Sequence, residues 1–257
     1  MQGAMKNHPD PSQKFGDVAA RYAQLRPAYP PEIFSFLLDR LEGLRARAVD
    51  LGAGSGQASA ALVRHFAHVS AVEPDARMLA HFSIDSAEKI NLPAEEANFA
   101  AGSIDAVIAA TSFHWMEQEE ICASVARWLR PGGVFFPFLY GPFIVHGPAR
   151  AVYEAHWRLW APFMDERLGA KADYSRSIGA SGGFEKIETF NGKTHTRLNP
   201  ADTAALFGTT SYARSYAAHR GDEDGYLQSL TDEIAAVAEE VQVEFPLGGV
   251  LAVRKSD

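Results

Sequence analysis

Apolar residues in the first part of the chain follow two alternating patterns. Short apolar runs, typical of strands that are covered on both faces, are separated by longer segments in which apolar residues recur every third or fourth position, as on one face of a helix. This alternation predicts right-handed crossovers and a doubly wound parallel sheet. The expected strands cover residues 48–51, 69–73, 90–92, 103–110 and 134–140. The expected helices cover 15–23, 33–44, 58–66, 75–82 and 119–129, and 94–102 is expected to be a short helix or a loop.

The alternation ends after residue 140. The remaining pattern predicts helices at 151–164, 202–207 and 225–240, a strand at 184–190, and a closing antiparallel pair of strands at 241–245 and 249–253. The predicted fold class is therefore α/β, with a Rossmann-like, doubly wound, seven-stranded and mostly parallel sheet. A C-terminal antiparallel strand and a helical cap insertion complete it.

Composition argues against several classes of protein. The formal net charge of -8 lacks the basic balance that a nucleic-acid backbone requires of its partner. No apolar run approaches the ~20 residues that span a bilayer, and the polar first residues carry no secretory signal. We therefore expect no nucleic-acid or membrane partner and a cytoplasmic location. The single cysteine, Cys122, allows no internal disulfide, and the histidines lack ligand spacing, so we expect no metal.

The most informative stretch is 48–57, where an apolar run that contains Asp50 breaks into three glycines, Gly52, Gly54 and Gly56. Glycine adopts backbone angles that other residues resist and lets a ligand approach the main chain. The helix expected after it offers unpaired N–H groups at its N-terminus. A strand, a glycine loop and a helix in this order predict a ligand site at the carboxyl end of the strand.

Spacing predicts which ligand binds there. Glu73 ends the next strand, roughly 20 residues beyond the loop, where a carboxylate can accept hydrogen bonds from both hydroxyls of an adenosine ribose. A dinucleotide fingerprint has its third glycine one position later than Gly56, where this chain has Gln57. The spacing therefore favours an adenosyl ligand without phosphates over a pyrophosphate cofactor.

Five segments in this order resemble the class I S-adenosylmethionine-dependent methyltransferases of the small-molecule type (methyltransferase type 11), and among them the trans-aconitate-methyltransferase-like proteins. The segments are Arg26-Pro27-Ala28-Tyr29-Pro30, Asp50-Leu51-Gly52-Ala53-Gly54-Ser55-Gly56, Glu73-Pro74-Asp75, Phe113-His114-Trp115 and Arg130-Pro131-Gly132-Gly133. The resemblance implies S-adenosylmethionine as the cofactor and a small-molecule methyl acceptor. We expect a flexible tail at 1–14, a cofactor-binding α/β core with an N-terminal lid at 15–140, a cap insertion at 141–181 and completion of the sheet at 182–257.

The resemblance also implies roles for individual residues. Gly52, Ala53 and Gly54 would face the methionine part of the cofactor, Glu73 and Pro74 the ribose, Ala94 and Glu95 the adenine, and Tyr22 and Arg26 the carboxylate. Many relatives carry an aspartate at the position of Pro93, so adenine recognition would depend more on shape, main chain or Glu95. Asp50 would either cap the loop or orient the cofactor amine. Tyr22 and Arg26 have a second interpretation, as packing and surface residues.

His114 and Trp115 follow the strand at 103–110, at the edge where ligands bind in open α/β sheets. We expect them to position the acceptor, with general base as an alternative role for His114. A carboxylate is one candidate acceptor, and it would need no base because it is already anionic, whereas a hydroxyl or an amine would call for one. The aromatic stripe at 153–163 either packs the cap or lines the acceptor pocket, and Arg214 either binds an anionic acceptor or lies at the surface.

Three other functions share parts of this pattern. A nicotinamide-dependent oxidoreductase has the same order of strand, glycine loop and helix, and a cofactor-binding relative without catalysis would share every motif. Gly179-Ala180-Ser181-Gly182-Gly183 matches the G-x-S-x-G pattern of serine hydrolases. That motif requires a preceding strand and a following helix, whereas we expect a strand after it.

Overall fold

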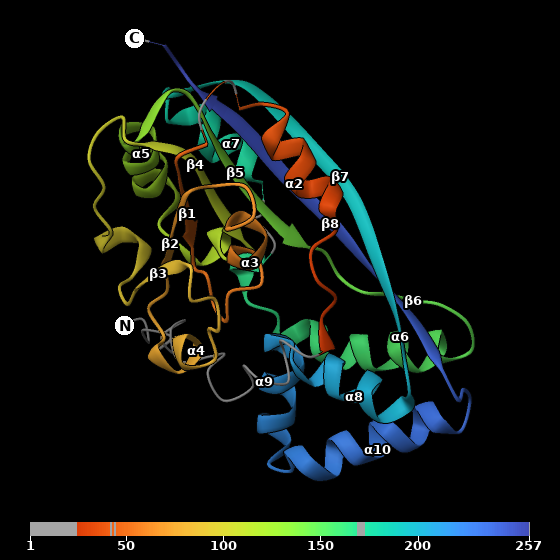
Figure 1. Ribbon diagram of the computed structural model, residues 1–257. Coiled ribbons are helices and arrows are strands. Elements are labelled where there is room, and N and C mark those ends of the chain that lie inside the picture. Colours follow the sequence, from red (N-terminus) through yellow and green to blue (C-terminus); the bar gives the residue numbers. More distant parts are fainter. Residues whose placement is uncertain (1–24, 42, 44, 169–172, 257) are drawn as a thin grey trace, which may run out of the picture.

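The protein is described by a computed structural model that covers residues 25–41, 43, 45–168 and 173–256. Its centre is a sheet with the strand order β3-β2-β1-β4-β5-β8-β6, and β7 pairs with β8 (Figure 1). The strands are β1 Arg47–Leu51, β2 His68–Val72, β3 Ala87–Ile90, β4 Ile104–Ala110, β5 Leu129–Tyr140, β6 Ile144–Val145, β7 Phe184–Leu198 and β8 Val241–Arg254. The predicted fold class is confirmed, with eight strands in place of seven because the two-residue β6 also pairs with β8.

The helices are α2 Pro31–Leu38, α3 Ser59–Leu62, α4 Ala76–Ala80, α5 Gln118–Trp128, α6 Ala149–Trp160, α7 Tyr174–Ala180, α8 Pro200–Gly208, α9 Ser211–Arg220 and α10 Glu223–Ala235. The sequence pattern missed α7 and α9, and it placed β3 too late in the chain. The reason for the β3 error is that Glu88 and Lys89 are exposed on a strand at the edge of the sheet, so the strand lacks an apolar run. The helix predicted at 15–23 lies outside the described residues.

Helices cover both faces of the parallel half of the sheet, as a doubly wound fold requires. Strand β4 is buried along nearly its whole length. Val107 packs in one apolar cluster with Val125 and Trp128 of α5. Its neighbour Ile108 belongs to a second cluster, with Leu37 of α2. Successive residues of a strand point to opposite faces of the sheet. Because helices cover both faces at β4, its residues must be apolar without a break.

Strand β8 corrects one prediction. Residues 241–254 form a single strand, so the antiparallel pair predicted at 241–245 and 249–253 is wrong. One edge of β8 pairs with β7 from Phe184↔Arg254 to Leu198↔Val241, and the other edge pairs with β5 and then β6. A Cβ on Gly249 would lie 2.7 Å from the ring of Phe136. Close packing therefore explains this glycine, whereas two adjacent glycines in a sequence usually suggest a turn.

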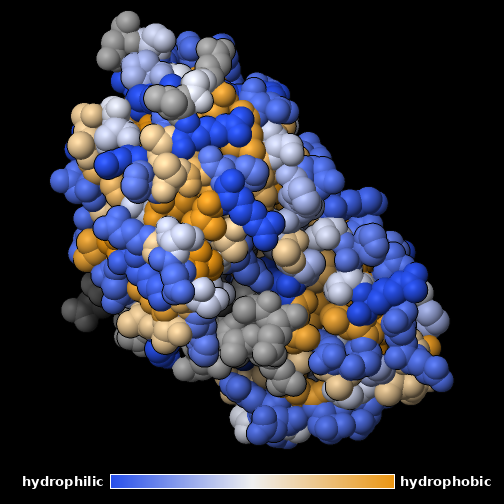
Figure 2. All heavy atoms as spheres, viewed as in Figure 1, coloured by the Kyte–Doolittle hydropathy of each residue, from blue (hydrophilic) through white to orange (hydrophobic). Residues whose placement is uncertain are grey.

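A helical layer lies beyond the carboxyl ends of the parallel strands. It consists of α6, α8, α9 and α10, which pack on one another (Figure 1). Within it, the Trp160 indole N–H donates to the Tyr226 hydroxyl oxygen at 2.7 Å, and that hydroxyl lies 2.7 Å from His156 Nδ1. Hydrophilic residues predominate on the outer surface of this layer in the view of Figure 2. Three of its helices, α8, α9 and α10, belong to the segment 182–257, which the sequence predicts to complete the sheet. The predicted domain boundaries stay a prediction.

Candidate functional site

A cavity of about 900 Å³ lies between the carboxyl edge of the sheet and the helical layer. Its lining includes the loops after β1, β2, β4 and β5, together with side chains of α6 and α9 and part of β8. Open α/β sheets bind ligands at this edge. Of the predicted site residues, those that line the cavity are Arg26, Gly52, Ala53, Gly54, Glu73, Pro74, Ala94, Glu95, His114 and Trp115. Tyr22 lies outside the described residues.

The glycine loop is held by main-chain hydrogen bonds. The N–H groups of Gly52 and Ala53 both donate to the carbonyl of Val72, at 2.8 and 3.0 Å. Gly52 has a φ of 69°, and a Cβ there would lie 2.5 Å from Cβ of Ser112. Ser112 in turn donates from its hydroxyl to the carbonyl of Leu51 at 2.6 Å. Only glycine fits at position 52, because the loop turns in the left-handed region against the end of β4.

Glu73 is fixed at the lip of the cavity. Its carboxylate accepts from the N–H of Gly54 at 2.8 Å and from the N–H of Asp75 at 2.9 Å, and 8% of the residue is exposed. Burial raises the pKa of this carboxyl, and the two main-chain hydrogen bonds oppose that shift. A carboxylate has about four acceptor positions, so Glu73 retains capacity for the hydroxyls of a ligand.

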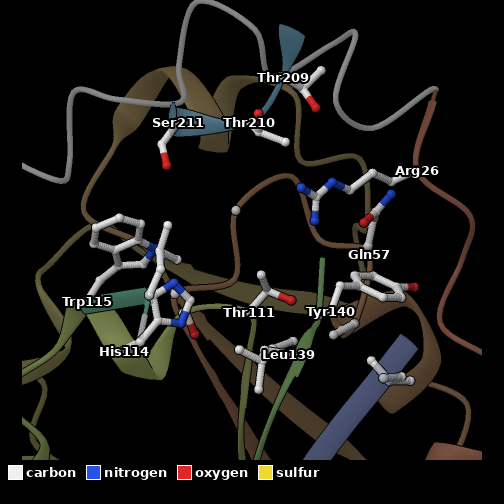
Figure 3. A pocket seen from close by; sticks show the side chains of 18 of the residues that line it. Arg26, Gln57, Thr111, His114, Trp115, Leu139, Tyr140, Thr209, Thr210 and Ser211 are labelled. Carbon is white, nitrogen blue, oxygen red and sulfur yellow. The ribbon is translucent and has the colours of Figure 1, made fainter. Parts of the chain in front are cut away.

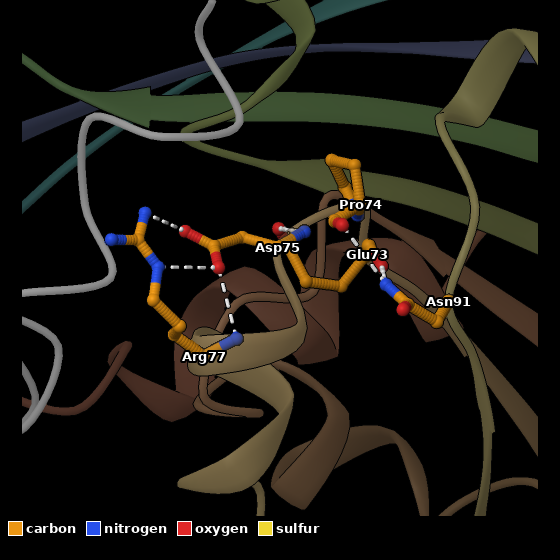
Figure 4. Close-up of polar contacts among 5 residues, drawn as sticks. All are labelled: Glu73, Pro74, Asp75, Arg77 and Asn91. Carbon is orange, nitrogen blue, oxygen red and sulfur yellow. Dashed lines mark hydrogen bonds and ion pairs between the residues drawn. The ribbon is translucent and has the colours of Figure 1, made fainter.

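The turn after Glu73 is braced from two sides (Figure 4). The Asn91 side-chain amide donates to the carbonyls of Glu73 and Pro74, at 2.8 and 2.9 Å. Asp75 caps α4 by accepting from the N–H of Arg77 at 2.9 Å, and the Arg77 guanidinium pairs with the same carboxylate at 2.9 Å. These contacts hold Glu73 and Pro74 in place before any ligand binds.

Asp50 lies behind the loop and does not line the cavity. It is fully buried, and its Oδ2 accepts from the Ser59 hydroxyl at 2.7 Å. Its Oδ1 is buried without a hydrogen-bond partner. Burial raises the pKa of Asp50 to about 7, although the hydrogen bonds from Ser59 oppose the shift. Asp50 thus ties the loop to α3.

The wall predicted to contact adenine contains Pro93, Ala94 and Glu95. Ala94 is buried and begins a short 3₁₀ turn, Ala94–Glu96. The Glu95 carboxylate accepts from the N–H of Glu117 at 3.0 Å, just before α5. One oxygen of Glu95 therefore joins this wall to α5. The shape of the wall and its main-chain groups remain as the features that can recognise a planar base.

Arg26 and the residues after it lie across the ends of β4 and β5. The Arg26 guanidinium carbon is 5.9 Å from the ring centroids of Tyr140 and of Phe143. Figure 3 shows Arg26 beside Gln57, the residue after the glycine loop. The Tyr140 hydroxyl donates to the carbonyl of Pro27 at 3.2 Å, which holds this segment against β5.

His114 and Trp115 belong to the 3₁₀ turn Phe113–Trp115 after β4. His114 Nδ1 lies 3.1 Å from the Tyr174 hydroxyl. Burial, and then the charge of Arg167, lowers the pKa of His114 to about 4, so its imidazole is neutral near pH 7. The Arg167 guanidinium carbon lies 4.8 Å from the Trp115 ring centroid. This arrangement suits a positioning role better than proton transfer.

Several cavity residues were not singled out from the sequence. Thr111 has a φ of 57°, which is rare for a β-branched residue, and its hydroxyl lies 3.0 Å from the hydroxyl of Tyr29. Thr209, Thr210 and Ser211 line the cavity at the start of α9. The sequence Gly-Thr-Thr-Ser at 208–211 is typical of a turn and could have indicated these three residues. Nothing in the sequence indicates the backbone angle of Thr111.

The remaining alternatives are also resolved by position. Within the aromatic stripe, Tyr153 and Trp160 are buried in the helical layer, whereas Trp157 lines the cavity. Arg214 lies on α9 and is not among the residues that line the cavity. Ser181 follows helix α7 and precedes strand β7, which is the reverse of the order that a hydrolase nucleophile requires.

In the part of the chain that the structure describes, no helix combines the length and the apolar composition needed to cross a membrane. Within the same residues, no group of three or more His, Cys, Asp or Glu side chains is arranged to hold a metal ion.

Comparison with known proteins finds similarity to methyltransferases. Residues 49–136 match the model of a methyltransferase domain. The chain is 37% identical over 126 residues to an uncharacterized methyltransferase of Mycobacterium bovis, covering 48% of this chain and 51% of that protein. It is 30% identical over 165 residues to a protein of Dictyostelium discoideum assigned as a methyltransferase, covering 58% and 60%. The chain thus spans about half to three fifths of the length of these curated relatives.

Solved structures of methyltransferases share the fold of this chain. A protein of Anaeromyxobacter dehalogenans assigned as a type II methyltransferase superimposes with a TM-score of 0.75 at 25% identity, covering 90% of this chain and 99% of that one. Phosphoethanolamine N-methyltransferase 2 of Haemonchus contortus, solved with S-adenosyl-L-methionine, has the same fold, with a TM-score of 0.55 at 17% identity over 96% of this chain and 59% of that one. Residues 49–136 therefore match a methyltransferase domain, and the chain shares the fold of these solved methyltransferase structures.

Proposed function

We propose that this protein transfers a methyl group from S-adenosylmethionine to a small-molecule acceptor by in-line displacement. The observation that carries the proposal is the placement of Glu73. Its carboxylate lies at the lip of the cavity, anchored by N–H groups of the glycine loop and of Asp75, with acceptor capacity to spare. A ribose seated there would have its adenine near Ala94 and Glu95 and its methionine part along Gly52, Ala53 and Gly54.

The residues present fit this cofactor. S-adenosylmethionine, when bound, supplies a methyl group on a positively charged sulfur. Asp50 lies behind the loop that would receive the methionine part and does not line the cavity, which favours the role of supporting that loop over orienting the cofactor amine. Arg26, and Tyr22 by the family resemblance, would close over the cofactor carboxylate, since a guanidinium fork matches that group.

The contribution of the protein to the reaction is alignment and exclusion of water. His114 and Trp115 would position the acceptor, with His114 kept neutral by burial. A carboxylate acceptor and the trans-aconitate-like subtype stay predictions from the family resemblance. The cytoplasmic location and the lack of nucleic-acid and membrane partners stay predictions from composition and charge.

Calorimetric titration with two ligands tests the proposal. We expect S-adenosylhomocysteine to bind and reduced nicotinamide dinucleotide not to bind. The reverse result would support an oxidoreductase and overturn the proposal. A second step, incubation of labelled S-adenosylmethionine with a panel of small acceptors, separates an active enzyme from a relative that binds the cofactor without catalysis.

A further inference from the structure

Tyr174 and His114 form a buried pair behind one wall of the cavity. The Tyr174 hydroxyl lies 3.1 Å from His114 Nδ1, and each residue is only 1% exposed. Of the two, His114 alone lines the cavity, and Figure 3 shows its ring beside that of Trp115. Tyr174 is the first residue of α7, a helix that the sequence pattern did not predict. It therefore acts on the cavity only through His114.

The Tyr174 hydroxyl is held in a fixed position by its surroundings. The Tyr174 ring meets the ring of Phe113 edge-on, with 5.0 Å between centroids and 70° between planes. One turn further along α7, the Ser177 hydroxyl donates to the side-chain carbonyl of Gln118 at the start of α5. Ile178 of the same helix is fully buried in the apolar cluster that contains Phe113. The packing of α7 thus sets the distance from the hydroxyl to the imidazole.

Both groups of the pair are neutral near pH 7. Burial, and then the charge of Arg167, lowers the pKa of His114 to about 4, and the charge of Asp165 opposes this shift. Burial raises the pKa of Tyr174, and the main-chain N–H of His114, which acts on the Tyr174 oxygen, opposes that shift. Tyr174 therefore keeps its proton, and the imidazole carries one proton on one of its two nitrogens.

The Tyr174 proton decides which nitrogen of His114 is protonated. Among the described residues, His114 Nδ1 is the only acceptor within hydrogen-bond distance of the Tyr174 hydroxyl. If Nδ1 carried the imidazole proton and donated it, the buried hydroxyl would have no acceptor for its own proton, and an unpaired buried donor costs free energy. The hydroxyl therefore donates, Nδ1 accepts, and the imidazole proton is on Nε2.

Nε2 is the nitrogen that meets the cavity. It has no hydrogen-bond partner in the part of the chain that the structure describes, yet it is not one of the fully buried polar atoms that lack a partner. Because His114 lines the cavity, its Nε2–H is a donor that a ligand can reach. A protonated Nε2 has no lone pair, so in this tautomer it cannot take a proton from a substrate.

We propose, building on the methyltransferase function above, that Tyr174 is a positioning residue that fixes His114 as a hydrogen-bond donor toward the methyl acceptor. Nε2–H donates to a lone pair on an oxygen or nitrogen of the acceptor and so orients the acceptor in the cavity. A group that can only donate hydrogen bonds does not fit this contact. The methylated atom of the acceptor must therefore attack without a base at His114.

Nitrogen-15 NMR of the full protein tests the tautomer directly. Correlations from the ring C–H protons distinguish a protonated from an unprotonated ring nitrogen. The chain has nine histidines, and comparison with His114→Gln assigns the signals of His114. At pH 7 we expect the proton on Nε2 and none on Nδ1. A proton on Nδ1, with or without one on Nε2, overturns the inference.

Tyr174→Phe tests the positioning role. It keeps the aromatic packing on Phe113 and removes only the hydroxyl, so His114 should populate both tautomers. Tyr153→Phe is the matched control, because the Tyr153 hydroxyl is buried without a hydrogen-bond partner in the described part of the chain and does not line the cavity. A purely structural role for Tyr174 would lower only the midpoint of thermal unfolding. An unchanged tautomer in Tyr174→Phe therefore contradicts its assignment.

Two neutral probes of the same shape test the donor role. Acetophenone has a carbonyl oxygen where 2-phenylpropene has a methylene group, so only acetophenone can accept a hydrogen bond from Nε2–H. In titrations with S-adenosylhomocysteine present, we expect acetophenone to bind at least about fivefold more tightly and to shift the His114 Nε2 signal. His114→Gln, whose side-chain amide can also donate, should retain this preference, and His114→Leu should lose it. Tighter binding of 2-phenylpropene, or no shift with acetophenone, overturns the donor role.

The proposed function and the role of Tyr174 can fail separately, because the tautomer is measured both with and without S-adenosylhomocysteine. No binding of S-adenosylhomocysteine to the wild-type protein would contradict the proposed function. Intact binding of that ligand, together with a proton on Nδ1, would contradict only the roles assigned to Tyr174 and His114.

Discussion

The two sides of the cavity are built in different ways. The cofactor side comes mostly from residues 50–95, and main-chain groups define much of it, as in the hydrogen bonds from Gly52 and Ala53 to Val72 and from Gly54 to Glu73. The acceptor side is assembled from α6, α9 and the ends of β4, β5 and β8, and side-chain surfaces define it.

This difference has a functional consequence. The glycine loop tolerates few substitutions, because its left-handed backbone angle and the close approach of Ser112 leave no room for a side chain at Gly52. Packed side chains can be exchanged for others of similar volume at modest cost. The cofactor side is therefore expected to be constrained and the acceptor side adaptable, and substitutions on the two sides should separate these properties.

The largest effect is expected at Gly52. Gly52→Ala combines a left-handed φ of 69° with a Cβ 2.5 Å from Ser112, so the loop must move. We expect the Kd for S-adenosylhomocysteine to rise about a hundredfold or more, measured by calorimetry, because strain of about 1–3 kcal/mol adds to the displaced contact. Gly147→Ala is the matched control, since its φ is 74° and nothing lies within 4 Å of the added Cβ. Equal effects on binding in the two variants would contradict the crowding argument.

The next effect concerns Asp50 and pH. The pKa of Asp50 is about 7 in the folded protein against an ordinary value of 3.8. Between these values the folded state binds more protons than the unfolded state, so the free energy of unfolding falls as pH rises. Asp50→Asn removes this titrating group. The free energy of unfolding of the variant minus that of wild type should therefore increase by about 2–3 kcal/mol from pH 5 to pH 8. Urea unfolding at both pH values measures the difference, and an unchanged difference would argue against a buried proton.

Glu73 should have a smaller effect, confined to ligand binding. Glu73→Ala removes the acceptor for the ribose hydroxyls and should weaken S-adenosylhomocysteine binding by ~1–3 kcal/mol. Glu120→Ala, an exposed acid on α5, serves as the control for the change of charge. Unchanged affinity in a folded Glu73 variant would refute the ribose assignment.

The smallest effect on cofactor binding is expected at Trp157. Its ring meets that of Tyr212 edge-on at 5.2 Å and lines the cavity. Trp157→Leu should lower kcat/KM for the methyl acceptor about fivefold, the scale of one lost aromatic contact, and should leave the Kd for S-adenosylhomocysteine within about twofold. Leu159→Ala, on the exposed side of the same helix, is the control. If the Trp157 change weakened cofactor binding as much as the Glu73 change, the two sides would not be independent.

The same contrast explains what the sequence could predict. The glycine loop, Glu73 and the strands around them follow from neighbouring residues, so the α/β core was predicted close to its observed form. Thr111 could not be recognised, because its backbone angle depends on hydrogen bonding between β4 and β5. The continuous β8 was missed because Gly248 and Gly249 suggest a turn. The ring of Phe136 and the Cβ of Phe138, more than a hundred positions earlier, explain Gly249. Nor could the partner of Trp160 be anticipated, since Tyr226 is on another helix.

The central position of β8 also affects how the chain can fold during synthesis. This strand contains residues 241–254, yet it lies between β5 and β7 and separates segments made much earlier on the ribosome. Until it emerges from the exit tunnel, β5 and β7 each keep an open edge that invites association with other nascent chains. Completion of the sheet therefore waits for the synthesis of β8, and ribosome stalling shortly before codon 241 should expose an aggregation-prone intermediate.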